Sequence, residues 1–207
     1  MQEKIKKPTN LHKLVILARK NADFFQDLDR RAYARITKGD QRGELYPLDS
    51  SCFENWLSAI NFKVHDEVAS SKLKLDAREH LEVESRLSGK NYNVGLRVIS
   101  NEEFIEIDLG DQDWKSVQIT KDGWRVRAHK NFFYRNNSIK ALPIPCKDKL
   151  DDDWVESIFN ISGNNQSMLI MGWLVGCFMS EGPRPMLVIQ GEQGSGKSFL
   201  ASILRGL

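Results

Sequence analysis

The chain has 207 residues, of which 41% are hydrophobic and 28% charged, so it has ordinary globular composition and can bury a core. Its 3 cysteines are far apart and form no disulfide or metal-ligand pattern. Its longest apolar run, residues 168–179, is shorter than the roughly 20 residues that span a bilayer. These features argue against a disulfide scaffold and a transmembrane helix, and we expect a cytoplasmic protein with no membrane partner.

Charge is spread unevenly along the chain. Residues 1–42 contain 11 basic and 5 acidic residues, whereas residues 43–89 contain 5 basic and 9 acidic residues. The formal net charge of +2 therefore argues neither for nor against a nucleic-acid partner, and local patches matter more than the total. We assign residues 1–10 to a basic tail that precedes the folded chain.

The first folded segment is predicted to be a helix followed by a hairpin. Asn10 stands where an N-cap is expected. Apolar residues then recur on one helical face, at Leu11, Leu14, Val15, Ala18, Ala22 and Phe25. Two short strands are expected at residues 31–37 and 44–47, around a glycine-containing turn.

Two further helices are predicted after the hairpin. The sequence Ser51-Cys-Phe-Glu54 is a capping-box pattern at the start of the first of them. Its apolar face is formed by Phe53, Trp56, Leu57 and Ile60. The second covers about residues 71–87, and Gly89 is a natural C-terminal stop.

Residues 94–126 have the clearest strand signal in the chain. Apolar residues alternate with polar or small ones in four runs, which are Val94, Leu96 and Val98, then Ile105, Ile107 and Leu109, then Val117 and Ile119, then Trp124 and Val126. Asn101, Gly110 and Gly123 lie at the expected turns. We therefore predict an antiparallel meander, and with it an α+β accessory domain over residues 11–140.

Residues 123–147 contain no acidic residue and combine cations with aromatic rings. Such a strip suits single-stranded DNA, because cations neutralise phosphates and aromatic rings stack on bases. The alternative is that the rings belong to the core and the cations line a solvated sheet edge. The candidate DNA contacts are Arg125, Arg127, Lys130, Phe133 and Arg135.

A linker and a second domain are expected to follow. The prolines of Ala141-Leu-Pro-Ile-Pro145 favour an extended backbone, so we assign residues 141–150 to the linker. A short helix after residues 151–153 and a nearly all-apolar helix over residues 166–179 come next. We assign residues 151–207 to the start of a P-loop α/β domain, on the evidence of the motif near its end.

That motif is Gly191-Glu-Gln-Gly-Ser-Gly-Lys-Ser198, which matches the P-loop (Walker A) pattern of nucleotide-binding proteins. It follows an apolar run over residues 186–190, expected to be a buried parallel strand. The residues after it place Leu200, Ile203 and Leu204 on one helical face. Strand, loop and helix thus stand in the order that the motif requires, and the alternative is a purely structural glycine-rich turn.

The residue types of this loop fit ATP and Mg²⁺. Its glycines let main-chain N–H groups wrap phosphate oxygens, and the helix N-terminus adds its positive end. Lys197 can reach the β and γ phosphates, and the Ser198 hydroxyl can ligate Mg²⁺. The candidate cofactor-binding residues are Gly191, Glu192, Gln193, Gly194, Ser195, Gly196, Lys197 and Ser198.

Several strings along the chain resemble a group of phage, plasmid and integrative-element proteins. They are Arg31-Ala-Tyr-Ala-Arg-Ile36, Ile105-Glu-Ile-Asp-Leu-Gly-Asp-Gln-Asp-Trp114, Asp122-Gly-Trp-Arg-Val126 and residues 182–198. The resemblance implies a replicative DNA helicase or primase-helicase of a mobile element, with an AAA+ or superfamily III type motor that hydrolyses ATP. It also implies a homo-oligomer, a hexamer, in the parent protein.

Hydrolysis by such a motor needs an acidic strand residue (Walker B), a sensor that orients water and an arginine finger. None can be assigned in this chain, so its catalytic residues are unknown and we expect the chain alone to be inactive. The first hypothesis is an ATP-binding N-terminal fragment of a DNA helicase that acts in replication. The alternatives are a non-catalytic DNA-binding or regulatory remnant that associates with an intact ATPase, and a small-molecule kinase with an N-terminal extension.

Overall fold

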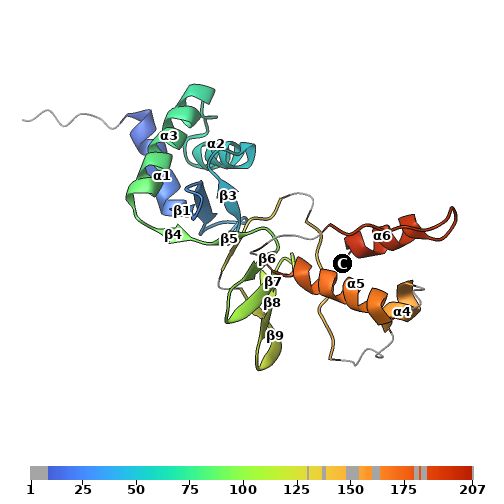
Figure 1. The fold of residues 1–207 in the computed structure, drawn as a ribbon. Coiled ribbons are helices and arrows are strands. Elements are labelled where there is room, and N and C mark those ends of the chain that lie inside the picture. Colours follow the sequence, from blue (N-terminus) through green and yellow to red (C-terminus); the bar gives the residue numbers. More distant parts are fainter. Residues whose placement is uncertain are drawn as a thin grey trace, which may run out of the picture.

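The computed structural model describes residues 9–129, 131–136, 139–147, 154–159, 164–179, 182 and 186–206. These residues form a mixed α+β fold, which agrees with the α+β part of the class expected from the sequence (Figure 1). The helices are α1 (Asn10–Asn21), α2 (Ser51–His65), α3 (Ser71–Leu87), α4 (Trp154–Phe159), α5 (Asn164–Cys177) and α6 (Lys197–Gly206).

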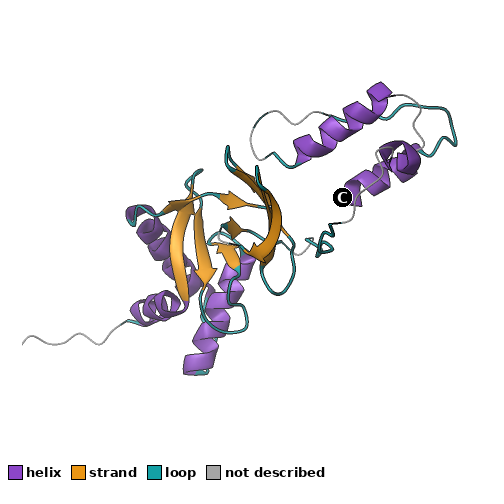
Figure 2. Ribbon diagram, turned by 90° about the horizontal axis from the view of Figure 1, so that it is seen from below, coloured by secondary structure: helices purple, strands orange, loops and turns teal. Residues whose placement is uncertain are grey.

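The N-terminal sheet has four strands in the spatial order β3-β2-β1-β4. They are β1 (Ala22–Asp27), β2 (Ala32–Ile36), β3 (Leu45–Pro47) and β4 (Asn91–Tyr92). The β1–β2 and β2–β3 pairs are antiparallel, so the predicted hairpin is present, and β4 pairs in parallel with β1. Helices α1, α2 and α3 lie together on one side of this sheet (Figure 2).

The main core lies between this sheet and the three helices. Alternate residues of β2, namely Ala32, Ala34 and Ile36, point toward the helices, and the small alanines let the helix backbones approach the sheet closely. Leu81 of α3 and Phe53 of α2 are fully buried in the same cluster. Burying one such large apolar side chain stabilises the fold by about 1.5–3 kcal/mol.

Helix α1 is shorter than its apolar periodicity predicts, and this expectation was wrong at its C-terminal end. The helix stops at Asn21, and Ala22 and Phe25 lie in β1. Phe24 and Phe25 are both buried, in different clusters on the two faces of the sheet. Only a strand points consecutive side chains to opposite faces, so packing on two sides overrides the helical pattern.

The helix N-caps also differ from the expected ones by one residue. Thr9, not Asn10, caps α1, because its hydroxyl accepts a hydrogen bond from the His12 amide at 3.2 Å. Ser50, not Ser51, caps α2 through the Phe53 amide, also at 3.2 Å. Helix α3 ends as expected, with Gly89 in the left-handed region just after the C-cap.

The predicted meander is present as a second four-stranded sheet. It consists of β6 (Val98–Ser100), β7 (Phe104–Asp108), β8 (Lys115–Thr120) and β9 (Gly123–Ala128), in sequential antiparallel order. Ile107 pairs with Val117 and Val117 with Val126, which gives one apolar face. Only the end of the expected first run belongs to it: Val98 begins β6, whereas Val94 lies in another sheet and Leu96 is 61% exposed.

A two-stranded parallel sheet connects the two larger sheets. It pairs β5 (Val94–Gly95) with β10 (Phe132–Phe133). Phe132 packs on the face of the N-terminal sheet opposite the helices, where Phe25 and Tyr33 are buried. The chain after the meander therefore returns to the N-terminal sheet.

Helices α4, α5 and α6 form the second helical group, with Val155, Ile170 and Leu204 as its buried residues. Phe178, just after α5, packs against the apolar face of the meander. Among the residues that the structure describes, no helix has the length and apolarity needed to cross a membrane. Near the start of the expected linker, the Leu142 amide donates a hydrogen bond to the Leu109 carbonyl at 2.8 Å, so this part of the chain contacts the meander.

Candidate functional site

The loop over residues 191–196 leads directly into α6, in the loop–helix order that the motif predicts. Gly194 and Gly196 have φ angles of +84° and +82°, in the left-handed region that favours glycine. A Cβ on Gly191 would lie 2.8 Å from the Ser195 Oγ, so a larger residue there would require this hydroxyl to turn away. The glycines thus allow a tight turn at the N-terminus of the helix.

Lys197 folds its side chain back over this loop. Its ammonium donates hydrogen bonds to the carbonyl oxygens of Gly191, at 2.8 Å, and Glu192, and it lies 3.3 Å from the Ser195 Oγ. The loop therefore holds a positive charge at the N-terminal end of α6. Gln193 and Ser198 are exposed beside it. The eight motif residues are thus together at one end of one helix.

The apolar run before the loop is not the buried strand that we expected. Residues 186–190 form no strand, and exposure alternates along them, with Met186 88% and Val188 66% exposed. Leu187 and Ile189 point the other way, into the cluster of α4, α5 and α6. A parallel strand is buried when strands flank it and helices cover both faces. Here helices cover one face, and no described strand pairs with the run.

The residues of the predicted DNA-binding strip do not form one outward-facing strip. Phe133 is 1% exposed and packs against the His129 ring, so it cannot stack on a base. Arg125 is exposed and bonds the Gln118 side chain at 2.9 Å. Arg127 and Arg135 point toward buried acids. Lys130 lies outside the described residues.

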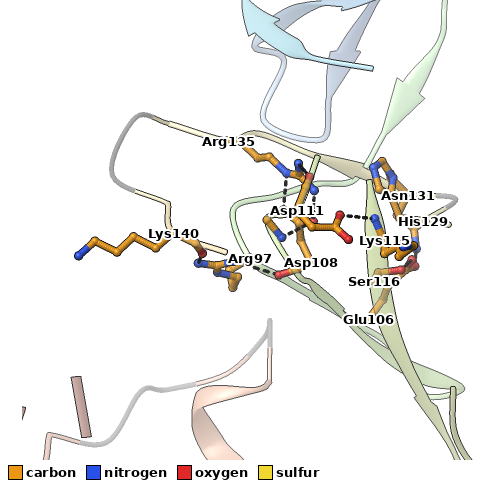
Figure 3. Close-up of polar contacts among 11 residues, drawn as sticks. Arg97, Glu106, Asp108, Asp111, Lys115, Ser116, His129, Asn131, Arg135 and Lys140 are labelled. Atoms are coloured by element: carbon orange, nitrogen blue, oxygen red, sulfur yellow. Dashed lines mark hydrogen bonds and ion pairs between the residues drawn. The ribbon is translucent and has the colours of Figure 1, made fainter. Parts of the chain in front are cut away.

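Arg135 is held by the end of β7 and the turn after it (Figure 3). Its guanidinium bonds both carboxylate oxygens of Asp108, at 2.5 and 2.8 Å, and the Asp111 carbonyl. It also lies over the Trp114 ring, 3.9 Å from the ring centre. Asp108 is fully buried, so the pair is shielded from solvent.

A second buried carboxylate lies two residues earlier on the same face of β7. Glu106 accepts hydrogen bonds from the Ser116 hydroxyl at 2.6 Å and the Asn131 amide at 2.5 Å (Figure 3). The Arg127 guanidinium is 3.7 Å from it. Next to it, His129 donates a hydrogen bond from Nδ1 to the Asn131 carbonyl at 2.7 Å, because a carbonyl oxygen can only accept. Burial lowers the pKa of His129 below its usual value.

This polar network fastens the segment after β9 to the meander. Arg97 extends it by donating to the carbonyl oxygens of Asp108 and Lys140, at 3.0 and 2.7 Å. Among the described residues, no group of three or more His, Cys, Asp or Glu side chains could hold a metal ion. The contacts of this cluster are ion pairs and hydrogen bonds between chain segments.

Sequence reasoning missed Glu106 and Asp108 as partners of the strip. Alternation in β7 placed Ile105 and Ile107 on the apolar face. Glu106 and Asp108, which alternate with them, would ordinarily face water. Ser116 and Gln118 alternate in the same way on β8, and this second polar row was the available signal. Polar residues paired across two neighbouring strands, followed by a cation-rich segment, indicate a buried network of hydrogen bonds and ion pairs.

Comparisons with protein-family models, with curated proteins and with solved structures find no match to this chain.

Proposed function

We propose that this chain binds ATP with Mg²⁺ at the loop of residues 191–198. The observation that carries the proposal is the complete motif at the start of α6, with Gly194 and Gly196 at positive φ and the Lys197 ammonium already over the loop. Phosphate oxygens would replace the Gly191 and Glu192 carbonyls as acceptors for this ammonium. The exposed Ser198 hydroxyl would ligate Mg²⁺, as the motif implies.

We further propose that the protein acts in a DNA-dependent ATPase, a replicative helicase of a mobile element that works as a hexamer in the cytoplasm. This rests on the sequence resemblance and on the motif. In this proposal the α+β part formed by α1–α3 and β1–β10 supplies contacts to DNA or to neighbouring subunits. The loop contributes positive charge and main-chain donors to the triphosphate.

The experiment is titration of a fluorescent ATP analogue with Mg²⁺ into the full chain. Lys197→Ala should weaken binding about tenfold or more, because a hydrogen bond to a charged group is worth about 1.5–3 kcal/mol. Lys121→Ala, which removes an exposed cation in the β8–β9 turn, is the matched control and should bind as the wild type does. Equal binding by all three proteins, or none by the wild type, would reject the proposal.

A further inference from the structure

The face of the N-terminal sheet opposite its helices displays arginines beside aromatic rings. Arg31 directly precedes β2, and Tyr33 and Arg35 lie in it. These three residues are two apart along an extended chain, so their side chains share this face. The Arg31 guanidinium lies 5.8 Å from the centre of the Tyr33 ring, and that of Arg35 lies 5.2 Å from the centre of the Phe132 ring. Both arginines are exposed.

The edge of the same face holds an aromatic ring that is open to solvent. Tyr92 lies on β4, the edge strand, and is 41% exposed. Its ring centre is 4.7 Å from that of Phe132 and 5.1 Å from that of Phe25. These contacts restrict the orientation of the Tyr92 ring, so stacking a flat group on it costs little side-chain entropy.

We propose that this arginine–aromatic face, formed by Arg31, Arg35, Tyr92 and Phe132, binds single-stranded nucleic acid. A base would stack on the exposed side of Tyr92, and the two arginines would contact phosphates. Arg31 and Arg35 are four residues apart on an extended chain, or roughly 13 Å, so they can reach different phosphates of one strand. The choice of ligand rests on the proposed DNA-dependent ATPase.

The charges around this face leave the arginines able to take a phosphate. Arg31 pairs with Asp49 at 2.9 Å, but both side chains are about half exposed, and such surface pairs are weak. Asp23 stands opposite Arg35 in the β1–β2 register, yet no ion pair to Arg35 is found among the described residues. The strip predicted from sequence differs here, since Arg127 and Arg135 form ion pairs with buried carboxylates.

The test is fluorescence anisotropy of a labelled 20-nucleotide oligo-dT with the full chain at several salt concentrations. We expect binding that weakens as salt rises. Tyr92→Ala should weaken it about tenfold at every salt concentration, the loss expected for one stacked base. Arg35→Gln should weaken binding and reduce the slope of log K against log salt by about 0.7, the value for one phosphate contact on a single strand.

Three control variants show whether a loss of binding comes from unfolding, or whether the strip predicted from the sequence binds the oligonucleotide instead. Tyr92→Phe keeps the ring and should bind as the wild type does, and Arg35→Lys should retain the salt slope. Arg125→Gln removes the exposed arginine of the strip and should leave binding unchanged. Wild-type affinity in both Tyr92→Ala and Arg35→Gln, or no binding by the wild type at low salt, would overturn the proposal.

Nucleotide binding in the same samples separates this inference from the proposed function. Lys197→Ala should bind the ATP analogue about tenfold or more weakly and should bind oligo-dT as the wild type does. A wild type that binds oligo-dT in a Tyr92-dependent way but no ATP would support the arginine–aromatic face and reject the nucleotide site. A wild type that binds ATP but no oligo-dT would reject the face alone.

Discussion

The buried ion pair between Asp108 and Arg135 is the single contact whose loss should cost the most stability. Asp108 is fully buried, and the Arg135 side chain is only 16% exposed. Asp108→Asn would leave the guanidinium without its counter-charge, and breaking one partner of such a pair costs about 3–5 kcal/mol in the free energy of unfolding. Urea unfolding followed by far-UV circular dichroism measures this loss.

The matched control for that variant is Asp113→Asn, five residues after Asp108 in the turn that leads into β8. Asp113 is an exposed carboxylate that pairs with Lys115 at 2.6 Å, and surface pairs of this kind contribute little. Its unfolding midpoint should stay close to that of the wild type. If Asp108→Asn proved equally mild, the network would not be fastening the segment after β9.

His129 gives the stability of the chain a pH dependence. Its pKa is lowered in the folded chain, by burial first, while a histidine in the unfolded chain titrates near its usual value of about 6.5. Between these two pKa values the histidine is protonated in the unfolded chain but neutral in the folded chain. The contribution of His129 to the free energy of unfolding is therefore complete above about pH 6.5 and is lost as the pH falls. The His129 ring also lies 5.4 Å from Trp114, which reports on it by fluorescence.

The free energy of unfolding of His129→Gln should therefore change less between pH 7.5 and pH 5.5 than that of the wild type. The change that remains comes from the other titratable groups. Urea titrations at three pH values, compared with the exposed His65→Gln, measure the difference. A slope in His129→Gln as steep as in the wild type would show that this ring is not the group that titrates.

At the scale of elements, the β2–β3 hairpin offers two glycines that separate backbone strain from crowding. Gly39 and Gly43 both have positive φ, at +84° and +97°. A Cβ at Gly39 would meet open space, whereas one at Gly43 would lie 2.9 Å from the Trp114 ring. Gly39→Ala should cost about 1–2 kcal/mol from the left-handed backbone alone.

Gly43→Ala should cost clearly more than Gly39→Ala, because it adds a clash with Trp114 to the same strain. Trp114 is itself a non-glycine residue at positive φ, 54°, and it contacts Arg135 on its ring face, so it has little room to move. Thermal unfolding measures the loss of stability in each variant, and tryptophan fluorescence reports a change around Trp114. Equal losses of stability would mean that the hairpin shifts away from the meander.

The same elements show what local sequence could and could not predict. The four meander strands and helix α3 follow from alternation and capping, because their patterns and their packing agree. Helix α1 was predicted too long, since Ala22 and Phe25 fit a helical face equally well and only two-sided packing makes them a strand. A pattern of apolar residues cannot tell which partner will cover each face.

At the scale of the whole molecule, the P-loop motif was readable because its residues are contiguous, whereas the arginine–aromatic face was not. Arg35, Tyr92 and Phe132 come from three distant parts of the chain and meet only through β10. The polar rows of β7 and β8 are a local signal for Glu106 and Asp108, but their partners Asn131 and Arg135 come from a later segment and were not predictable from those rows. Sites assembled by long-range pairing have no local signature.

The two helical groups of the molecule should differ in local stability. Among the residues that the structure describes, the core beneath α1–α3 contains sixteen buried side chains, whereas the cluster of α4, α5 and α6 contains three. Helix α5 also exposes Met168, Leu169 and Val175, so it loses less apolar surface to burial. Local opening is easiest where buried apolar contacts are few.

We therefore expect amide hydrogen exchange to be faster in α5 and α6 than in α1 and α3, at a pH and temperature where the chain is folded. Mass spectrometry of peptides from the two groups measures the difference. If the proposed nucleotide site is correct, ATP with Mg²⁺ should slow exchange over residues 191–206 and leave α1 and α3 unchanged, because a ligand stabilises the region that it binds. Lys197→Ala removes that response while keeping the ligand-free pattern. Equal protection in both helical groups would show that three buried side chains suffice to hold α4–α6 as firmly as the main core.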